Sequence, residues 1–406
     1  MPSLPVELLA ARSFAETFGG RAAVVGRAPG RVELLGNHTD YNGGLVLAAA
    51  IDRFTAVAGR VVAGHAARFR SAGFPEGLGF DFGPNPIEPG EAGSWGRYVR
   101  GVAWALQDDR GDFASGVEAA IAGDVPLGAG LSSSASLQAA LAVFLLRSGV
   151  VPDSSADLDD PARLDLARVL QRSENAFVGV ASGLLDQFTV LFGRAGYALT
   201  LDCRSLDFHR VPLGSPPPAI VVCDSKTSRR LADGMYNRRR AECETVVAHF
   251  QDLRGPGSVR WLRDVTLDDL ESAWDALDPV GRLRARHVLT ENLRVTRGAD
   301  ALRRGDLAEF GRLISASHAS SRDDFENSSP ALDAMVEAAE ASPGFLGGKL
   351  SGAGWAGCTV NLVASDQADA FAASVAASYA RRTGTTPDVH VCRSADGASG
   401  SDWNGD

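Results

Sequence analysis

The chain of 406 residues contains few cysteines, and no two of them form a C-x-x-C pair. Its five thiols are odd in number and scattered, which favours free cysteines in a reduced compartment over a disulfide framework. The seven histidines are scattered too, whereas a zinc site needs His and Cys ligands that cluster. The sequence therefore predicts neither a disulfide scaffold nor a zinc site.

Long apolar runs and an excess of basic charge are also absent. The longest apolar stretch of consequence, residues 139–146, is far shorter than the roughly 20 residues that a membrane helix needs. No basic residue precedes the short apolar stretch at residues 8–11, as a secretion signal would require. A net charge of −10 repels nucleic-acid backbones and anionic membranes. We therefore expect a cytoplasmic protein that binds neither nucleic acid nor membrane.

The remaining composition is that of a globular α/β chain with more than one domain. Apolar residues make up 45 % of the sequence, which is enough for a substantial core, and the length suits two or three domains of about 150 residues. Three consecutive prolines within residues 214–218 exclude helix and central strand and indicate a hinge. The Gly/Ser/Asp-rich tail at residues 394–406 is expected to be mobile.

Hydrophobic periodicity and helix-capping signals predict the elements on either side of this hinge. We expect helices over residues 7–18, 95–106, 132–147, 160–177 and 367–381, and a largely helical stretch from 237 to 317. We expect strands at residues 22–25, 31–35, 45–51, 56–62, 79–82, 219–223, 358–363 and 388–392. Within residues 160–177, Leu166, Leu170 and Glu174 recur at i and i+4, so a carboxylate is predicted in line with a buried stripe.

Residues 125–136, V-P-L-G-A-G-L-S-S-S-A-S, form a glycine turn that leads directly into a predicted helix. Glycines let the backbone approach a ligand, and the unpaired amides at a helix start attract an anion such as phosphate. The serines at 132–134 add donors and a possible metal ligand. The alternative is an ordinary turn with serine caps. The segment is not a Walker A loop, because no G-K-[ST] follows the glycines.

A second glycine cluster, G-A-G-W-A-G at residues 352–357, matches the G-x-G-x-x-G dinucleotide fingerprint by letter. That fingerprint requires a preceding strand and a following helix. Here we expect a loop at residues 342–349 before the cluster and a strand at 358–363 after it. The sequence therefore argues against a nicotinamide or flavin oxidoreductase.

A third segment, G-R-V-E-L-L-G-N-H-T-D-Y-N-G-G at residues 30–44, concentrates polar side chains between apolar runs. It holds a guanidinium, an imidazole, carboxylates, amides and a phenol, which is the inventory for hydrogen bonding to a polyhydroxylated ligand. A solvated polar loop is the alternative.

The order and spacing of these three motifs resemble those of the GHMP small-molecule kinases, and the polar segment resembles the galactokinase signature G-R-V-N-L-I-G-E-H-T-D-Y-N. The likeness extends from the helix before Ala28 to about Val363. It implies a two-domain α/β fold, with a ribosomal-S5-domain-2-like lobe at residues 1–205 and a ferredoxin-like lobe at 206–406. It also implies an enzyme that uses ATP and Mg²⁺ to phosphorylate the anomeric hydroxyl of galactose. We expect the protein to be a monomer.

The resemblance assigns roles to individual residues. Arg31 and Asp186 correspond to the pair beside the anomeric hydroxyl, and Glu174 and Ser134 to the Mg²⁺ ligands. The expected sugar contacts are Asn37, His38, Asp40, Gly183 and Tyr236. The expected ATP contacts are Trp95, Gly128, Gly130, Ser132, Ser133 and Ser134.

One departure from the signature leaves the sugar open. Asn37 stands where the family usually has Glu, whose carboxylate accepts a hydrogen bond from the C6 hydroxyl, and Glu33 stands where the family usually has Asn. Either the two groups are exchanged and galactose is retained, or the pocket admits galacturonate, arabinose or fucose. A non-catalytic sugar and ATP sensor is a further alternative, although such relatives have a damaged serine loop and residues 132–136 are complete.

Overall fold

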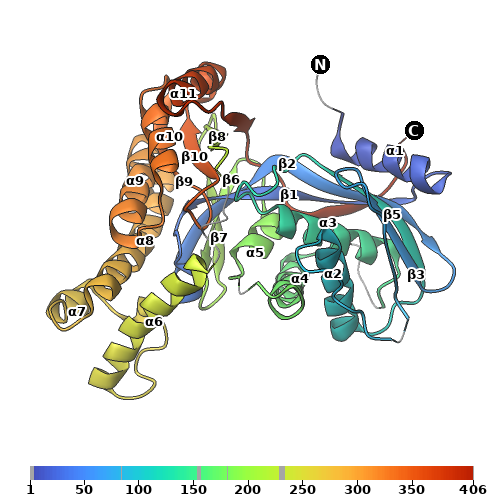
Figure 1. Ribbon diagram of the computed structural model, residues 1–406, viewed down its shortest axis with the longest axis horizontal. Coiled ribbons are helices and arrows are strands. Elements are labelled where there is room, and N and C mark those ends of the chain that lie inside the picture. The colour runs from blue at the N-terminus through green and yellow to red at the C-terminus, as the bar shows by residue number, and fades with distance from the viewer. Residues whose placement is uncertain (1–3, 84, 153–156, 181, 228–233, 406) are drawn as a thin grey trace.

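The computed structural model describes residues 4–83, 85–152, 157–180, 182–227 and 234–405, and these form two β-sheets flanked by helices (Figure 1). The larger sheet contains β1 (Val24–Leu35), β2 (Leu45–Val62), β3 (Ala66–Ser71), β4 (Leu78–Asp81), β5 (Gly116–Gly123), β6 (Tyr197–Asp202), β7 (Phe208–Pro212) and β12 (Ser399–Asp402). The smaller sheet contains β8 (Ala219–Asp224), β9 (Phe345–Leu350), β10 (Cys358–Val363) and β11 (Asp388–Cys392). Within the described ranges no helix is both long and apolar enough to cross a membrane.

Helices cover both faces of the larger sheet. On one face lies α1 (Val6–Phe18), and on the other α3 (Ser133–Ser148) and α5 (Leu185–Phe192) pack on the strands, with α2 (Trp95–Arg110) and α4 (Asp160–Arg172) outside them (Figure 1). Helix α3 is apolar around most of its circumference because it is enclosed by the sheet and these neighbours. Gly26 of β1 permits its closest approach, since a Cβ there would lie 2.2 Å from the carbonyl oxygen of Ala140.

The smaller sheet has the strand order β11-β8-β10-β9 and is antiparallel throughout. Along the chain β8 is followed by helices, then by β9 and β10, then by α11 (Ala368–Thr383) and β11. This is the β-α-β-β-α-β arrangement of a ferredoxin-like fold, as the family resemblance implies. The intervening helices are α6 (Met235–Arg254), α7 (Leu267–Ser272), α8 (Pro279–Arg303), α9 (Leu307–Ser320) and α10 (Pro330–Glu340).

One of the buried hydrophobic clusters spans both sheets. Leu34 of β1, Val222 of β8 and Leu362 of β10 belong to the same buried cluster, together with side chains of α8 and α9 such as Leu302 and Phe310. The proline segment at residues 214–218 connects β7 to β8 and so links the two sheets, while its role as a hinge stays a prediction. The boundary predicted at residue 205 falls inside the β6–β7 hairpin of the larger sheet.

The prediction of a mobile C-terminal tail is wrong for residues 399–402. This segment forms β12, which pairs antiparallel with β1, with Val24 opposite Asp402, and Arg147 of α3 forms an ion pair of 2.7 Å with Asp402. Composition alone indicates mobility, whereas the free edge of β1 supplies backbone partners that composition does not reveal.

The loop predicted at residues 342–349 is also wrong, because residues from Phe345 onward form β9. The glycines that suggested a loop allow close packing instead, since a Cβ on Gly347 would lie 2.1 Å from the carbonyl oxygen of Gly311 in α9. A strand therefore does precede the second glycine cluster. Strand β10, and not a helix, follows it, so the dinucleotide fingerprint is still incomplete.

The helix predicted over residues 160–177 changes character before its end. Helix α4 stops at Arg172 and continues as the π-helical turn η2 (Ser173–Val178), which carries Glu174. Such turns occur frequently at functional sites because the extra residue reorients side chains.

Candidate active site

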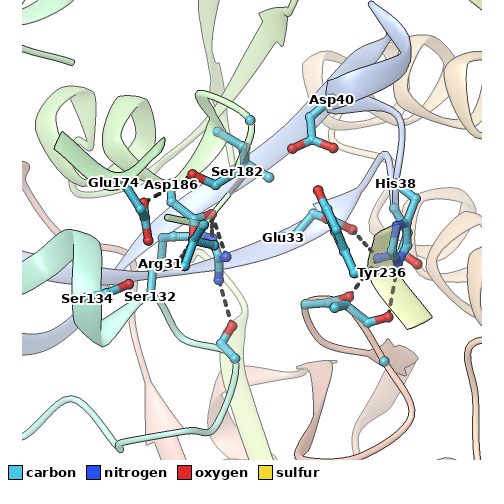
Figure 2. A pocket seen from close by; sticks show the side chains of 18 of the residues that line it. Arg31, Glu33, His38, Asp40, Ser132, Ser134, Glu174, Ser182, Asp186 and Tyr236 are labelled. Carbon is cyan, nitrogen blue, oxygen red and sulfur yellow. Dashed lines mark hydrogen bonds and ion pairs between the residues drawn. The ribbon is translucent and has the colours of Figure 1, made fainter. Parts of the chain in front are cut away.

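One cavity of about 600 Å³ gathers nearly all the residues that the sequence singled out (Figure 2). Its lining includes Arg31, Asn37, His38, Asp40, Gly128, Gly130, Ser132, Ser133, Ser134, Glu174, Gly183, Asp186 and Tyr236. Trp95 is the exception: it does not line this cavity, and its ring stacks on Phe74 with 6.0 Å between centroids. Its role in nucleotide binding stays a prediction.

Arg31 and Asp186 form an ion pair at one side of the cavity (Figure 2). Arg31 extends from β1 and donates from Nε to Asp186 Oδ1 over 2.7 Å, while its terminal nitrogen donates to the carbonyl oxygen of Gly130 over 2.6 Å. The second oxygen of Asp186 accepts from the Ser132 hydroxyl over 2.5 Å. The carboxylate at the start of α5 is thereby fixed beside the glycine turn.

The glycine turn meets α3 in a left-handed conformation. Gly128 and Gly130 have φ values of 73° and 75°, and Ser132, although not a glycine, has a φ of 58°. Such a φ disfavours a residue with a Cβ by roughly 1–2 kcal/mol, and strain of this kind clusters at functional sites. The Ser132 side chain does not cap α3 but contacts Asp186, which argues against the reading of these serines as ordinary caps.

Glu174 projects into the cavity from η2 on the same side as Arg31, Ser132 and Ser134 (Figure 2). Its Oε2 accepts hydrogen bonds from the Gln187 amide and, over 3.2 Å, from the Ser182 hydroxyl. Burial, and then the nearby Asp186 carboxylate, raise the pKa of Glu174 to about 7. A divalent cation in this place would relieve both effects. Sequence reasoning missed Gln187 and Ser182, although Gln187 directly follows Asp186.

Asp40 and Gly183 lie against each other in the lining of the same cavity. A Cβ on Gly183 would lie 2.1 Å from Oδ2 of Asp40, so only glycine fits without displacing the carboxylate. Burial, followed by repulsion from Glu33 and Asp186, raises the pKa of Asp40 to about 6. Among the described residues Asp40 forms no ion pair, so its carboxylate is suited to accept hydrogen bonds from the hydroxyl groups of a ligand.

His38 supports the wall of the cavity beside Tyr236. Its two ring nitrogens are bonded to the Tyr41 hydroxyl at 2.9 Å and to the carbonyl oxygen of Ala353 at 3.0 Å. Burial lowers the pKa of His38 to about 3, so the ring is neutral. It packs against Tyr236 with 5.4 Å between centroids. Both nitrogens of the imidazole are therefore hydrogen-bonded to protein groups, and its ring supports Tyr236.

Asn37 and Glu33 are linked in the depth of the same cavity. The amide of Asn37 donates to Glu33 Oε1 over 3.3 Å and to the carbonyl oxygen of Gly352 over 2.9 Å. Glu33 Oε1 also forms an ion pair of 2.5 Å with Lys349 of β9, whose side chain is 0 % exposed. Glu33 was not among the predicted sugar contacts. No residue of the second glycine cluster was predicted to contact a ligand. Both line the cavity, the cluster through Gly352, Ala353, Gly354 and Trp355.

Comparisons with known proteins agree with this geometry. A protein-family model described as the galactokinase galactose-binding signature matches residues 12–61. The family models for the N-terminal and C-terminal domains of GHMP kinases match residues 97–194 and 299–381. A galactokinase of Roseiflexus sp. (strain RS-1) is 44 % identical over 388 residues, which cover 95 % of this chain and 94 % of that protein. The Homo sapiens galactokinase is 40 % identical over 400 residues, which cover 97 % of this chain and 96 % of that protein.

The solved structures give the same result. The crystal structure of Lactococcus lactis galactokinase complexed with galactose superimposes with a TM-score of 0.87 at 33 % identity, and the match covers 96 % of this chain and 98 % of that one. A mevalonate kinase at 16 % identity, with a TM-score of 0.64, shares the fold. On the strength of the signature match and of relatives aligned over nearly its whole length, this chain belongs to the galactokinase family within the GHMP kinases.

Proposed function

We propose that this chain transfers the γ-phosphoryl group of ATP to the anomeric hydroxyl of α-D-galactose, giving galactose 1-phosphate and ADP. The observation that carries the proposal is the Arg31–Asp186 pair. It lies between the glycine turn before α3 and the pocket of Asp40, Gly183 and Tyr236, all within one cavity. A hydroxyl group beside this pair would face a phosphate held at the start of the helix.

Asp186 and Arg31 act on the hydroxyl oxygen and on the transferred group. The sugar oxygen forms a bond to the γ-phosphorus as the bond from that phosphorus to the β-phosphate oxygen breaks, and the hydroxyl proton leaves. Asp186 either accepts that proton or orients the hydroxyl, since Arg31 and Ser132 hold both of its oxygens in place. The fixed positive charge of Arg31 stabilises the negative charge that builds on the phosphoryl group.

The start of α3 is proposed to bind the nucleotide phosphates. The first amides of a helix lack partners within it, and the positive end of the helix dipole favours an anion. Among the described residues, and leaving aside its two chain neighbours, no atom lies within 4 Å of a Cβ built on Gly128, so the turn is open there. Ser133 and Ser134, the first residues of α3, supply hydroxyl groups at the same place.

Glu174 and Ser134 are proposed to hold Mg²⁺. Their donor atoms are oxygens, which Mg²⁺ prefers, and Mg²⁺ takes only one or two protein ligands when nucleotide phosphates supply others. The raised pKa of Glu174 fits a carboxylate whose charge is meant to be balanced by a bound cation. When bound, the ion would neutralise charge on the β- and γ-phosphates.

The proposal is tested by incubating the chain with ATP, Mg²⁺ and each candidate sugar, with ADP release coupled to a spectrophotometric readout. We expect the highest kcat/KM with galactose and a product phosphorylated at C1. A clear preference for galacturonate, arabinose or fucose would assign another substrate, whereas stoichiometric binding without turnover would indicate a sensor. We further propose a cytoplasmic monomer, which light scattering and cell fractionation would check.

A further inference from the structure

The side chain of Asn37 has no hydrogen-bonding capacity left for a ligand. An amide offers two N–H groups and an oxygen with two lone pairs. Its nitrogen donates to Glu33 and to Gly352, as described above, and its oxygen accepts from Asn327 over 2.9 Å and from Ser321 over 3.3 Å. Asn37 is only 1 % exposed. It joins the polar segment to the second glycine cluster and to residues after α9.

Glu33 is the opposite case, a buried carboxylate with one oxygen unused. Its side chain is 7 % exposed and lines the cavity. Both of its protein contacts, Lys349 and Asn37, are made through Oε1, and among the described residues Oε2 takes part in no hydrogen bond or ion pair. An unpartnered carboxylate oxygen on a largely buried side chain that lines a cavity favours a hydrogen-bond donor from a ligand.

Glu33 stands two residues beyond Arg31 on β1. Side chains two apart on a strand project to the same face about 6.5 Å from each other, and the intervening Val32 lies in the shared core, as does Leu34. A hexose has a similar extent from its anomeric hydroxyl to the opposite end of the ring. Figure 2 shows Glu33 beyond Arg31 and Asp186, toward Tyr236 and His38.

We propose that Glu33, and not Asn37, is the specificity-determining carboxylate, accepting a hydrogen bond from a hydroxyl at the C4–C6 end of the sugar. Asn37 is a positioning residue that orients Glu33 through Oε1, and Lys349 balances the charge. This inference rests on the proposed function. The negative charge that the family usually has at position 37 is thus supplied by Glu33, four residues earlier. This charge would repel a sugar that carries a carboxylate at C6, so the pocket disfavours such a sugar.

The test compares the effect of one substitution on kcat/KM across galactose and a set of sugars that each lack one hydroxyl group. Wild type and Glu33→Gln are assayed with galactose and with its 2-deoxy, 4-deoxy and 6-deoxy analogues. Glu33→Gln should lower kcat/KM for galactose about ten- to a hundredfold, because a charged hydrogen bond is lost. The same substitution should have little effect, about twofold or less, on the 4-deoxy or the 6-deoxy analogue, whichever lacks the recognised hydroxyl. An equal fold-loss on all four sugars would overturn the proposal.

Glu118→Gln is the matched control. Glu118 is also a strand carboxylate with a buried side chain, 6 % exposed, and it forms ion pairs with Arg60 and Arg68, but it lies outside the cavity lining. Its substitution should leave the ratios among the four sugars unchanged. Should Glu33→Gln fail to fold because Lys349 is left unpaired, the double variant Glu33→Gln/Lys349→Met removes both charges, and the same ratios are measured on it.

The wild-type protein allows a second test that needs no substitution. Turnover of galacturonate should be at least about a hundredfold below that of galactose, because its carboxylate would face Glu33. Comparable turnover of the two sugars would contradict the inference. No turnover of any sugar would instead contradict the proposed function, so the two failures are distinct.

Discussion

Arg31 holds Asp186 and the glycine turn with one guanidinium: it donates to the carboxylate over 2.7 Å and to the carbonyl oxygen of Gly130 over 2.6 Å. The carboxylate that is proposed to act on the sugar hydroxyl is therefore tied to the loop that is proposed to hold the phosphate. A rigid connection of this kind favours reaction by keeping the two substrates in a fixed relation.

Asp186→Asn should abolish most turnover. The amide keeps the shape of the side chain but cannot accept the sugar proton as a carboxylate does, so we expect kcat to fall by about 10²–10⁴. Nucleotide affinity, measured by calorimetry with a non-hydrolysable ATP analogue, should stay within about threefold of wild type. Turnover close to the wild-type rate would remove Asp186 from the reacting centre.

Glu174→Gln should raise the Mg²⁺ requirement. The amide preserves the size of the side chain but removes the charge that attracts a hard cation, so the Mg²⁺ concentration at half-maximal rate should increase at least about tenfold. The measurement is initial rate against free Mg²⁺ at saturating galactose. Glu118→Gln serves as the control and should leave that concentration unchanged; a Glu174 variant that behaves like it would exclude this carboxylate as a ligand.

Gly183→Ala should weaken sugar binding. The new Cβ would lie 2.1 Å from Oδ2 of Asp40, so the carboxylate must move from the position that faces the sugar. We expect the KM for galactose to rise about tenfold or more while the KM for ATP stays within about twofold. Gly73→Ala is the control, because in the described part of the chain no atom beyond its two neighbours lies within 4 Å of the added Cβ. An unchanged galactose KM would show that Asp40 does not need this position.

Galactose affinity should depend on pH through Asp40. Burial and nearby carboxylates raise the pKa of Asp40 to about 6, so protonation below that pH removes an acceptor and the KM for galactose should rise. Asp40→Asn should have a higher KM that is nearly constant between pH 5.5 and 8.

The same shift predicts a stability effect with a definite sign. Because the folded pKa of Asp40 exceeds its unfolded value, the ionised group destabilises the fold above pH 6, and this penalty disappears as the pH falls and the group protonates. Without sugar, Asp40→Asn should therefore melt above wild type at pH 8 and approach it near pH 4. A constant difference in Tm would contradict the assignment.

The family resemblance made much of the active site predictable. Arg31 lies in the polar segment, whose residue types themselves indicate a polar ligand, whereas the roles of Glu174 and Asp186 were predicted only from the resemblance. All three line one cavity. Helix α3 was predictable from the sequence itself, since a glycine turn marks its start and a long apolar run marks its course.

What sequence could not reveal depends on partners far along the chain. Strand β12 forms because the edge of β1 is free, and β9 carries glycines because α9 passes against it. Asn37 has the chemistry of a ligand contact, but its amide is engaged by Asn327, Ser321 and Gly352, which no local pattern could show. Oε2 of Glu33 is left without a protein partner among the described residues because Asn37 and Lys349 both contact Oε1, and Lys349 is distant in sequence.

The core shared by the two sheets limits how the molecule can open. A rigid-body separation of the two sheets would expose Leu34, Val222 and Leu362 to water. This exposure would cost a free energy of about 1.5–3 kcal/mol for each side chain. Entry and exit of a nucleotide are therefore expected to proceed by rearrangement of loops at the cavity rim, such as the turn where Leu127 is 70 % exposed, while the two sheets move as one block.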